Sequence, residues 1–84
     1  MVVHDLKTWP KFFEAVMEGR KTFELRRDDR GFEVGDVLQL QEWSPETGAF
    51  TGRSVSRRVT YLVRNAPEFG LQPGFVVLGL AEVE

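Results

Sequence analysis

A helix and the strand after it are encoded in residues 8–26, TWPKFFEAVMEGRKTFELR. Apolar residues recur here at the i, i+3, i+4, i+7 and i+8 spacing of one helix face, namely Trp9, Phe12, Phe13, Val16 and Met17. We expect Thr8 to cap the start of this helix, because a threonine hydroxyl accepts a hydrogen bond from a free backbone N–H there. Pro10 suits the first turn, and Gly19 suits the left-handed conformation that ends a helix.

Beyond the helix, apolar and polar residues alternate as in a β-strand. Phe23 and Leu25 share one face, and we assign Phe23 to the core together with the helix phenylalanines. Glu24 and Arg26 share the opposite, polar face, while Lys21 precedes the strand on the other parity. Charged groups gather around this junction more tightly than elsewhere, so we expect function to lie here.

The rest of the chain predicts four further strands, over residues 2–7, 37–43, 50–63 and 75–80. Residues 44–48 have the composition of a hairpin loop, and Gly52 marks a candidate bulge in the long strand. An open sheet of this size would leave unpaired edges. We therefore expect a mainly β (α+β) fold in one domain of residues 1–84: a small pseudo-barrel of about five strands with one helix packed at its end.

Composition excludes several classes of function. The 84 residues suffice for one small core, and no apolar run is long enough to span a bilayer, so we expect a cytoplasmic protein. The chain has no cysteine, which removes disulfides and thiol chemistry, and its single histidine, His4, argues against a zinc site. We expect no metal and no cofactor.

The cations are unevenly placed in a chain whose formal net charge is −2. A local basic patch can therefore exist despite the acidic total. Two groups stand out in the sequence: Arg20, Lys21, Arg26, Arg27 and Arg30, and then Arg53, Arg57, Arg58 and Arg64.

Four motifs extend over nearly the whole chain. They are His4-x-Leu6-Lys7, Gly19-x-Lys21-x-Phe23-Glu24-Leu25-Arg26, Asp29-Arg30-x-Phe32-x-Val34-Gly35-Asp36-x-Leu38 and, after Tyr61, Gly74-Phe75-Val76-Val77-Leu78. With these motifs the chain resembles the ASCH domains of the PUA-like superfamily, most closely a small bacterial and phage branch of unknown function. The resemblance implies a PUA-like pseudo-barrel with a polar cleft beside the helix that binds RNA or a modified nucleoside.

The resemblance also bears on catalysis. Enzymatic ASCH relatives remove an acyl group from modified cytidine with a lysine, a threonine two or three positions later, and a glutamate from a later segment. Lys21 matches the lysine, but Glu24 occupies the threonine position, and Glu68 is the only candidate for the later glutamate. This departure favours a ligand-binding site over a copied active site.

The first functional hypothesis is a binding module for RNA, a nucleotide or a modified nucleoside. Cations would contact phosphate, Glu24 would accept from a base edge, and Trp43 would offer a stacking platform, although an aromatic residue at a strand end more often covers the core. The residues expected to line this cleft are Lys7, Lys21, Glu24, Arg26 and Arg58, with Trp43 beside them.

Three alternatives stay open. In an enzyme, either a hydrolase of acylated nucleosides or a ribonuclease, Lys21 and Glu24 would be catalytic and water would attack. In a protein–protein adaptor, an apolar patch around Trp43 and Phe50 would be the contact surface. Alternatively, Glu24 and Arg26 form ion pairs, with Arg58 or Lys7 as partner, that only stabilise the fold.

Overall fold

The computed structural model describes residues 1–83 and contains five strands and one α-helix. In chain order these are β1 (Val3–Thr8), α1 (Pro10–Met17), β2 (Phe23–Arg27), β3 (Val37–Ser44), β4 (Ala49–Val63), the short 3₁₀ helix η1 (Pro67–Phe69) and β5 (Phe75–Glu82). The expected mainly β fold with one helix is confirmed. Among residues 1–83, no helix is long and apolar enough to cross a membrane.

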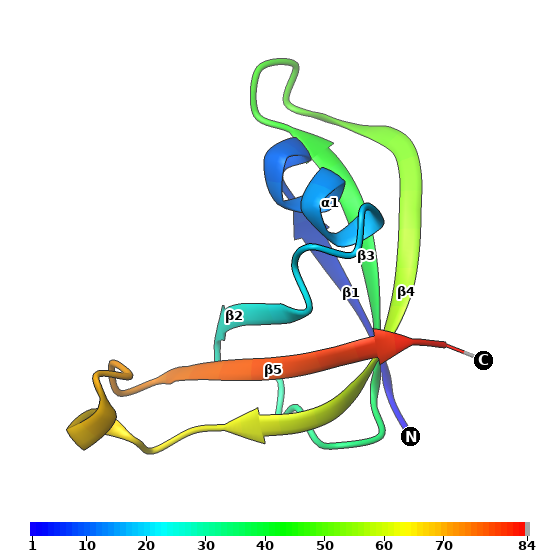
Figure 1. Ribbon diagram of the computed structural model, residues 1–84. Helices are drawn as coiled ribbons and strands as arrows, with labels where there is room; N and C mark the ends of the chain where they lie inside the picture. Colours follow the sequence, from blue (N-terminus) through cyan, green and yellow to red (C-terminus); the bar gives the residue numbers. More distant parts are fainter. Residues whose placement is uncertain (84) are drawn as a thin grey trace.

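The strands form one mixed sheet in the order β1-β3-β4-β5-β2, curled into a half-barrel (Figure 1). β1 and β3 run parallel, while the other neighbouring strands are antiparallel. Parallel neighbours need a long crossover connection, and here that connection contains α1 and β2. Figure 1 shows α1 over one end of β1 and β3, with β2 and β5 crossing on the other side of the opening. This crossing brings the helix start, β1 and β2 around one space.

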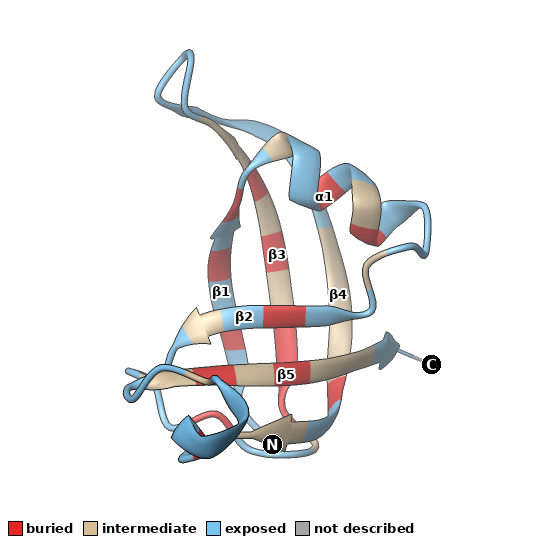
Figure 2. Ribbon diagram, turned by 60° about the vertical axis from the view of Figure 1, so that its left-hand side comes forward, coloured by how far each residue is buried: buried red, intermediate tan, exposed pale blue. Residues whose placement is uncertain are grey.

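The core lies on the concave side of the sheet. Burial alternates along β1, where His4, Leu6 and Thr8 are buried. Figure 2 shows further buried positions, in red, on β3 and β5. The fully buried side chains are Leu6, Phe13, Val16, Phe32, Leu38, Leu40, Val59, Val76 and Leu78. Among the residues of α1, only Phe13 and Val16 are buried.

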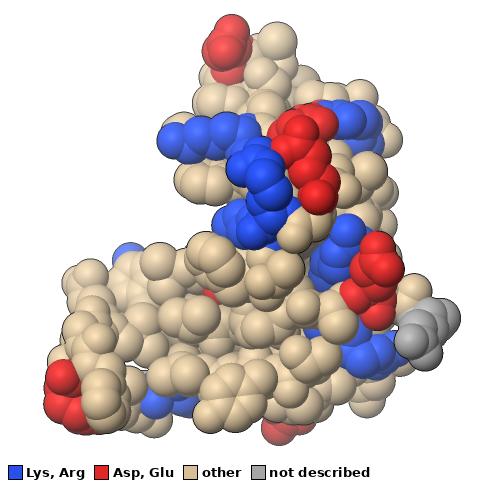
Figure 3. Space-filling model, in the orientation of Figure 1, with Lys and Arg blue, Asp and Glu red and all other residues tan. Residues whose placement is uncertain are grey.

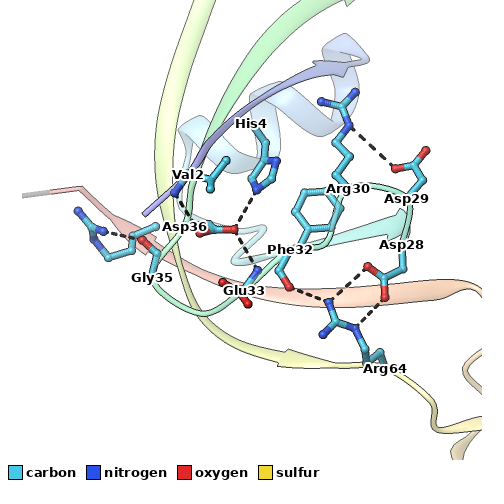
Figure 4. A network of polar contacts seen from close by, with 11 residues as sticks. Val2, His4, Asp28, Asp29, Arg30, Phe32, Glu33, Gly35, Asp36 and Arg64 are labelled. Atoms are coloured by element: carbon cyan, nitrogen blue, oxygen red, sulfur yellow. Dashed lines mark hydrogen bonds and ion pairs between the residues drawn. The ribbon is translucent and has the colours of Figure 1, made fainter.

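A buried carboxylate joins the first strand to the turn before β3. Asp36 lies 2.9 Å from His4 Nε2 and accepts hydrogen bonds from the backbone N–H groups of Glu33 and Val2 (Figure 4). Burial by itself would raise the pKa of Asp36, but these hydrogen bonds outweigh it and hold the pKa below its ordinary value. Asp36 is thus a turn residue that binds backbone amides, and His4 is a structural histidine packed against the Phe32 ring.

Two expectations about the helix were wrong. Thr8 does not cap it, because the inward parity of β1 turns its hydroxyl toward the barrel; the N-cap is Trp9, which makes no side-chain capping bond. The predicted apolar face is also only partly buried, since the side chains of Trp9, Phe12 and Met17 are each nearly half exposed. A short helix at the end of a half-barrel can turn only one side toward the core.

The alternation of two strands also differs from expectation. Phe23 is half exposed and Glu24 is buried, because the side of β2 that carries Glu24 faces the interior. Strict alternation over residues 50–63 predicts Tyr61 on the apolar face with Val59 and Val63. In β4 the register shifts between Val59 and Tyr61, so Tyr61 is exposed and Leu62 packs on the core instead. The expected irregularity at Gly52 is present, at a shift in the pairing of β3 with β4.

Replacing Asp36 by asparagine should lower the free energy of unfolding by about 1–3 kcal/mol at pH 7, because buried donors lose a charged acceptor. The folded-state pKa of Asp36 lies below its ordinary value of 3.8, so the stabilisation is complete above pH 3.8 and is lost as the pH falls through the folded-state value. Urea unfolding between pH 3 and pH 7 should show the wild type and Asp36→Asn converging at the acid end. Asp5→Asn, at an exposed position of β1, is the matched control. A difference that stays constant down to pH 3 would contradict this assignment.

Candidate functional site

A cleft of about 550 Å³ opens between the start of α1, the end of β1, and β2. Figure 3 shows the corresponding notch in the surface, with blue cationic side chains at its edge. The lining residues are Lys7, Thr8, Trp9, Phe12, Lys21, Phe23, Glu24, Leu25, Arg26, Arg27 and Phe75. The charged junction that dominates the sequence therefore forms one concave surface.

The centre of this surface is the carboxylate of Glu24, whose side chain is 5% exposed. Its Oε1 accepts from Lys21 Nζ at 2.6 Å, and its Oε2 accepts from Arg26 Nε at 2.7 Å. A buried carboxylate needs such partners, because an unpaired charge in the interior is costly. We call these three residues the charged triad.

Each cation of the charged triad is also fixed by backbone. Lys21 Nζ donates to the carbonyl of Phe23 at 2.8 Å, and Arg26 Nη2 donates to the carbonyl of Lys7 at the end of β1. The backbone N–H of Lys21 bonds to Ala15 O at 3.0 Å, so the helix end holds this residue against β2. Within one strand, the side chains of Lys21 and Glu24 would point to opposite sides. Lys21 instead lies in the turn before β2, and its side chain reaches Glu24.

Aromatic side chains and unpaired cations form the walls. Lys21 Nζ lies 5.0 Å from the ring centroid of Phe23, and the Arg27 guanidinium lies 5.1 Å from that of Phe75. Lys7 Nζ lies 4.7 Å from the ring of Trp43. Within residues 1–83, neither Lys7 nor Arg27 has an ion-pair partner. The walls therefore combine partly exposed aromatic rings with positive charge that no carboxylate neutralises.

One polar group at the cleft lacks a partner. Thr8 is 3% exposed, and its Oγ1 is the buried side-chain oxygen or nitrogen that makes no hydrogen bond within the described part of the chain. Such a hydroxyl costs about 1–3 kcal/mol when unsatisfied. Thr8 also belongs to the lining of the cleft.

The structure brings together four of the six residues predicted for binding: Lys7, Lys21, Glu24 and Arg26. The prediction that Arg58 lines the cleft was wrong. Arg58 lies opposite Val37 in the sheet, and its guanidinium donates a hydrogen bond to Gly35 O at 2.9 Å. Trp43 is half-buried, does not line the cleft, and touches it through Lys7.

Sequence reasoning missed the aromatic walls and Thr8. Phe12 and Phe23 had been assigned to the core, and Thr8 to the helix cap. Their local spacing is compatible with those roles, and only the curl of the sheet leaves them around an opening. The second basic group of the sequence does not form a patch, because its members are engaged elsewhere: Arg64 bonds Asp28 and Phe32 O, and Arg57 reaches Val16 O at the helix end.

Arg53 illustrates how the other cations are neutralised. It bonds Glu42 at 3.0 Å and Glu14 of α1 at 2.8 Å. Hydrogen bonds from Arg53 and Thr51 lower the pKa of Glu42, and both carboxylates raise the pKa of Arg53.

No group of three or more metal-ligating side chains occurs among residues 1–83.

Lys21 and Glu24 should be energetically coupled. A double-mutant cycle with Lys21→Met and Glu24→Gln should give a coupling of about 1–3 kcal/mol in urea unfolding, because each substitution leaves a shielded partner unsatisfied. The exposed pair Arg20 and Glu18, also in direct contact at 2.7 Å, is the matched control and should give less than about 0.5 kcal/mol. Equal couplings in the two cycles would contradict a special role for Glu24.

Residues 3–80 match the family described as "Domain of unknown function (DUF3850)". A similar protein is the "Uncharacterized 12.9 kDa protein in GpA 3'region" of Escherichia phage P2, which is 47% identical over 58 residues. That alignment covers 69% of this chain and 51% of the phage protein, so the chain spans about half the length of this curated relative. The chain belongs to the DUF3850 family.

Proposed function

We propose that this member of the DUF3850 family binds a nucleotide, either free or within single-stranded RNA, in the cleft between α1 and β2. The observation that carries the proposal is the combination of a cationic centre with aromatic walls in one cavity. Neither a purely apolar ligand nor a simple ion would use both features.

The charge of the cleft favours an anion. The charged triad contributes two cations and one carboxylate, a formal charge of +1. Lys7 and Arg27 add two more cations, which gives +3 at a site in a chain of net charge −2. Cations left unpaired at a cleft are suited to phosphate oxygens.

The walls favour an aromatic ligand of limited size. Phe12, Phe23 and Phe75 expose ring surface to the cavity, and stacking of a base on an aromatic ring contributes about 1–3 kcal/mol. The volume of about 550 Å³ lies within the range of roughly 300–1,000 Å³ typical of small-molecule sites. A single nucleotide suits this space better than a duplex, whose bases are stacked and unavailable.

We also propose a superfamily, a set of partners and a cellular location for this protein. The order of elements and the charged junction support a place for the family within the ASCH branch of the PUA-like superfamily, as one domain over residues 1–84. The expected partners are RNA, a nucleotide or a modified nucleoside, with no membrane, metal or cofactor, in the cytoplasm of a bacterial cell.

Binding should depend on the walls of the cleft. Binding of short single-stranded RNAs can be followed by tryptophan fluorescence, because Trp9, one of the two tryptophans, lines the cleft. Phe12→Ala and Phe23→Ala should each weaken binding by about 5- to 150-fold, because a stacking surface is lost. Phe69→Ala, at an exposed residue outside the cleft, is the matched control. Lys7→Gln should reduce the dependence of affinity on salt. Absence of binding at low salt, or binding unaffected by both wall substitutions, would overturn the proposal.

A second candidate is hydrolysis of an acylated nucleoside or of RNA, and the contact of Lys21 Nζ with Glu24 at 2.6 Å favours it. Such a pair can move a proton to and from water that attacks a carbonyl or phosphoryl group. The adaptor alternative has weaker support, because Trp43 is half-buried and pairs across the hairpin with Phe50, which alone of the two is exposed.

Catalysis should disappear when the proton-transfer pair is broken. The wild type should release acetate from N4-acetylcytidine or, in a separate assay, shorter fragments from RNA. Lys21→Met and Glu24→Gln should each lower the rate at least about 100-fold. Arg20→Gln, next to Lys21 but outside the cleft, should retain the wild-type rate. Equal turnover by the wild type and Lys21→Met would remove the enzymatic candidate and leave the binding proposal intact.

A further inference from the structure

A second, smaller hollow of about 140 Å³ adjoins the cleft. Its lining residues are Leu6, Arg26, Arg27, Asp29, Arg30 and Phe32. Arg26 and Arg27 line both cavities, so this end of β2 forms a shared wall. A ligand that fills the cleft therefore has cationic groups at the boundary with the hollow.

The hollow is basic. Three arginines and one aspartate line it, which gives a formal charge of +2. The aspartate compensates little, because Asp29 is 61% exposed and lies 4.0 Å from Arg30 Nε (Figure 4). Arg26 is paired with Glu24 at 2.7 Å, as Arg53 and Arg64 are paired with carboxylates elsewhere. The uncompensated guanidinium charge at this hollow is therefore that of Arg27 and Arg30.

Hydrogen bonds hold Arg26 and Arg30 in place before any ligand arrives. Arg26 is fixed by Glu24 and by the carbonyl of Lys7, and Arg30 Nη1 donates to the carbonyl of Asp5 at 2.8 Å. All three bonds end on β1 or β2, the strands that also bound the cleft. Guanidinium groups already oriented in this way lose little freedom when they bind an anion.

The size of the hollow selects among anions. At about 30 Å³ per water molecule, 140 Å³ holds only a few waters, which suits a phosphate group but not a base with its sugar. Guanidinium groups match the geometry of phosphate oxygens. The buried Leu6 and Phe32 form its apolar base and limit the competition from water.

We infer that this hollow is a phosphate subsite, and that the ligand of the neighbouring cleft is a phosphorylated nucleoside rather than a free one. The inference rests on the proposed nucleotide-binding function and deepens it. The aromatic part of the ligand lies against the cleft walls, and its phosphate is bound by Arg27 and Arg30, with Arg26 between the two cavities.

The test is calorimetric titration of the full chain with the four ribonucleosides and their 5′- and 3′-monophosphates. The wild type should bind at least one monophosphate about tenfold or more tighter than the matching nucleoside, because charge-assisted bonds are added. Arg30→Gln and Arg27→Gln should each reduce this ratio to less than about threefold. Arg20→Gln, which lines neither cavity, should leave it unchanged. Thermal unfolding checks that every variant is folded.

A second measurement does not depend on variants. In amide NMR spectra, inorganic phosphate and the monophosphate should shift the signals of Arg30 and Phe32, whereas the nucleoside should shift those of Phe12 and Phe23 only. The comparison of phosphates at the two sugar positions, and of a dinucleotide with them, distinguishes a free nucleotide from an RNA backbone.

The outcomes separate the two levels of the argument. Nucleoside binding without a gain from phosphate would overturn the subsite and leave the proposed function standing. A phosphate gain that survives both arginine substitutions would also overturn it, because the phosphate would then lie outside the hollow. No binding by any probe would overturn the proposed function and the inference together.

Discussion

The neutralisation of one buried carboxylate organises the functional end of this protein. Glu24 belongs to an edge strand, and its two oxygens bind a lysine from the helix-to-strand turn and an arginine two residues along the strand. Because that arginine also reaches the backbone of β1, the triad joins three segments that no strand pairing connects directly. The hydrogen bonds of the triad hold the helix-to-strand turn, β1 and β2 together at the cleft, whose lining comes from the same segments.

In the proposed binding function, the fixed centre and the open walls have different roles. Charged groups that are already paired and oriented provide a constant electrostatic field, whereas the exposed rings of Phe12 and Phe23 provide contact area. This division explains why the rings of Phe12 and Phe23 remain outside the core. They line the cleft together with the unpaired cations Lys7 and Arg27.

Much of the fold can be predicted from the sequence, because helical spacing and strand alternation are local properties. The helix, its glycine terminus and the five strands lie within one or two residues of their expected bounds. The site is predicted less completely. Nothing local shows that the inward face of β1 includes Thr8, or that β2 turns Glu24 inward and Phe23 outward, since both depend on which strands become neighbours. The prediction that Arg58 lines the cleft was wrong for the same reason, because its hydrogen-bond partner Gly35 is distant in sequence.

The order of the strands also sets the order of assembly. β2 is the third element of the chain, yet its only pairing among the described strands is with β5, the last one. During synthesis, Glu24 is translated before β5, residues 75–82, and β2 has no strand to pair with until β5 is present. The half of the barrel made by β1, β3 and β4 can pair first. The cleft is therefore complete only after β5 has paired with β2, because Phe75 of β5 is part of its lining.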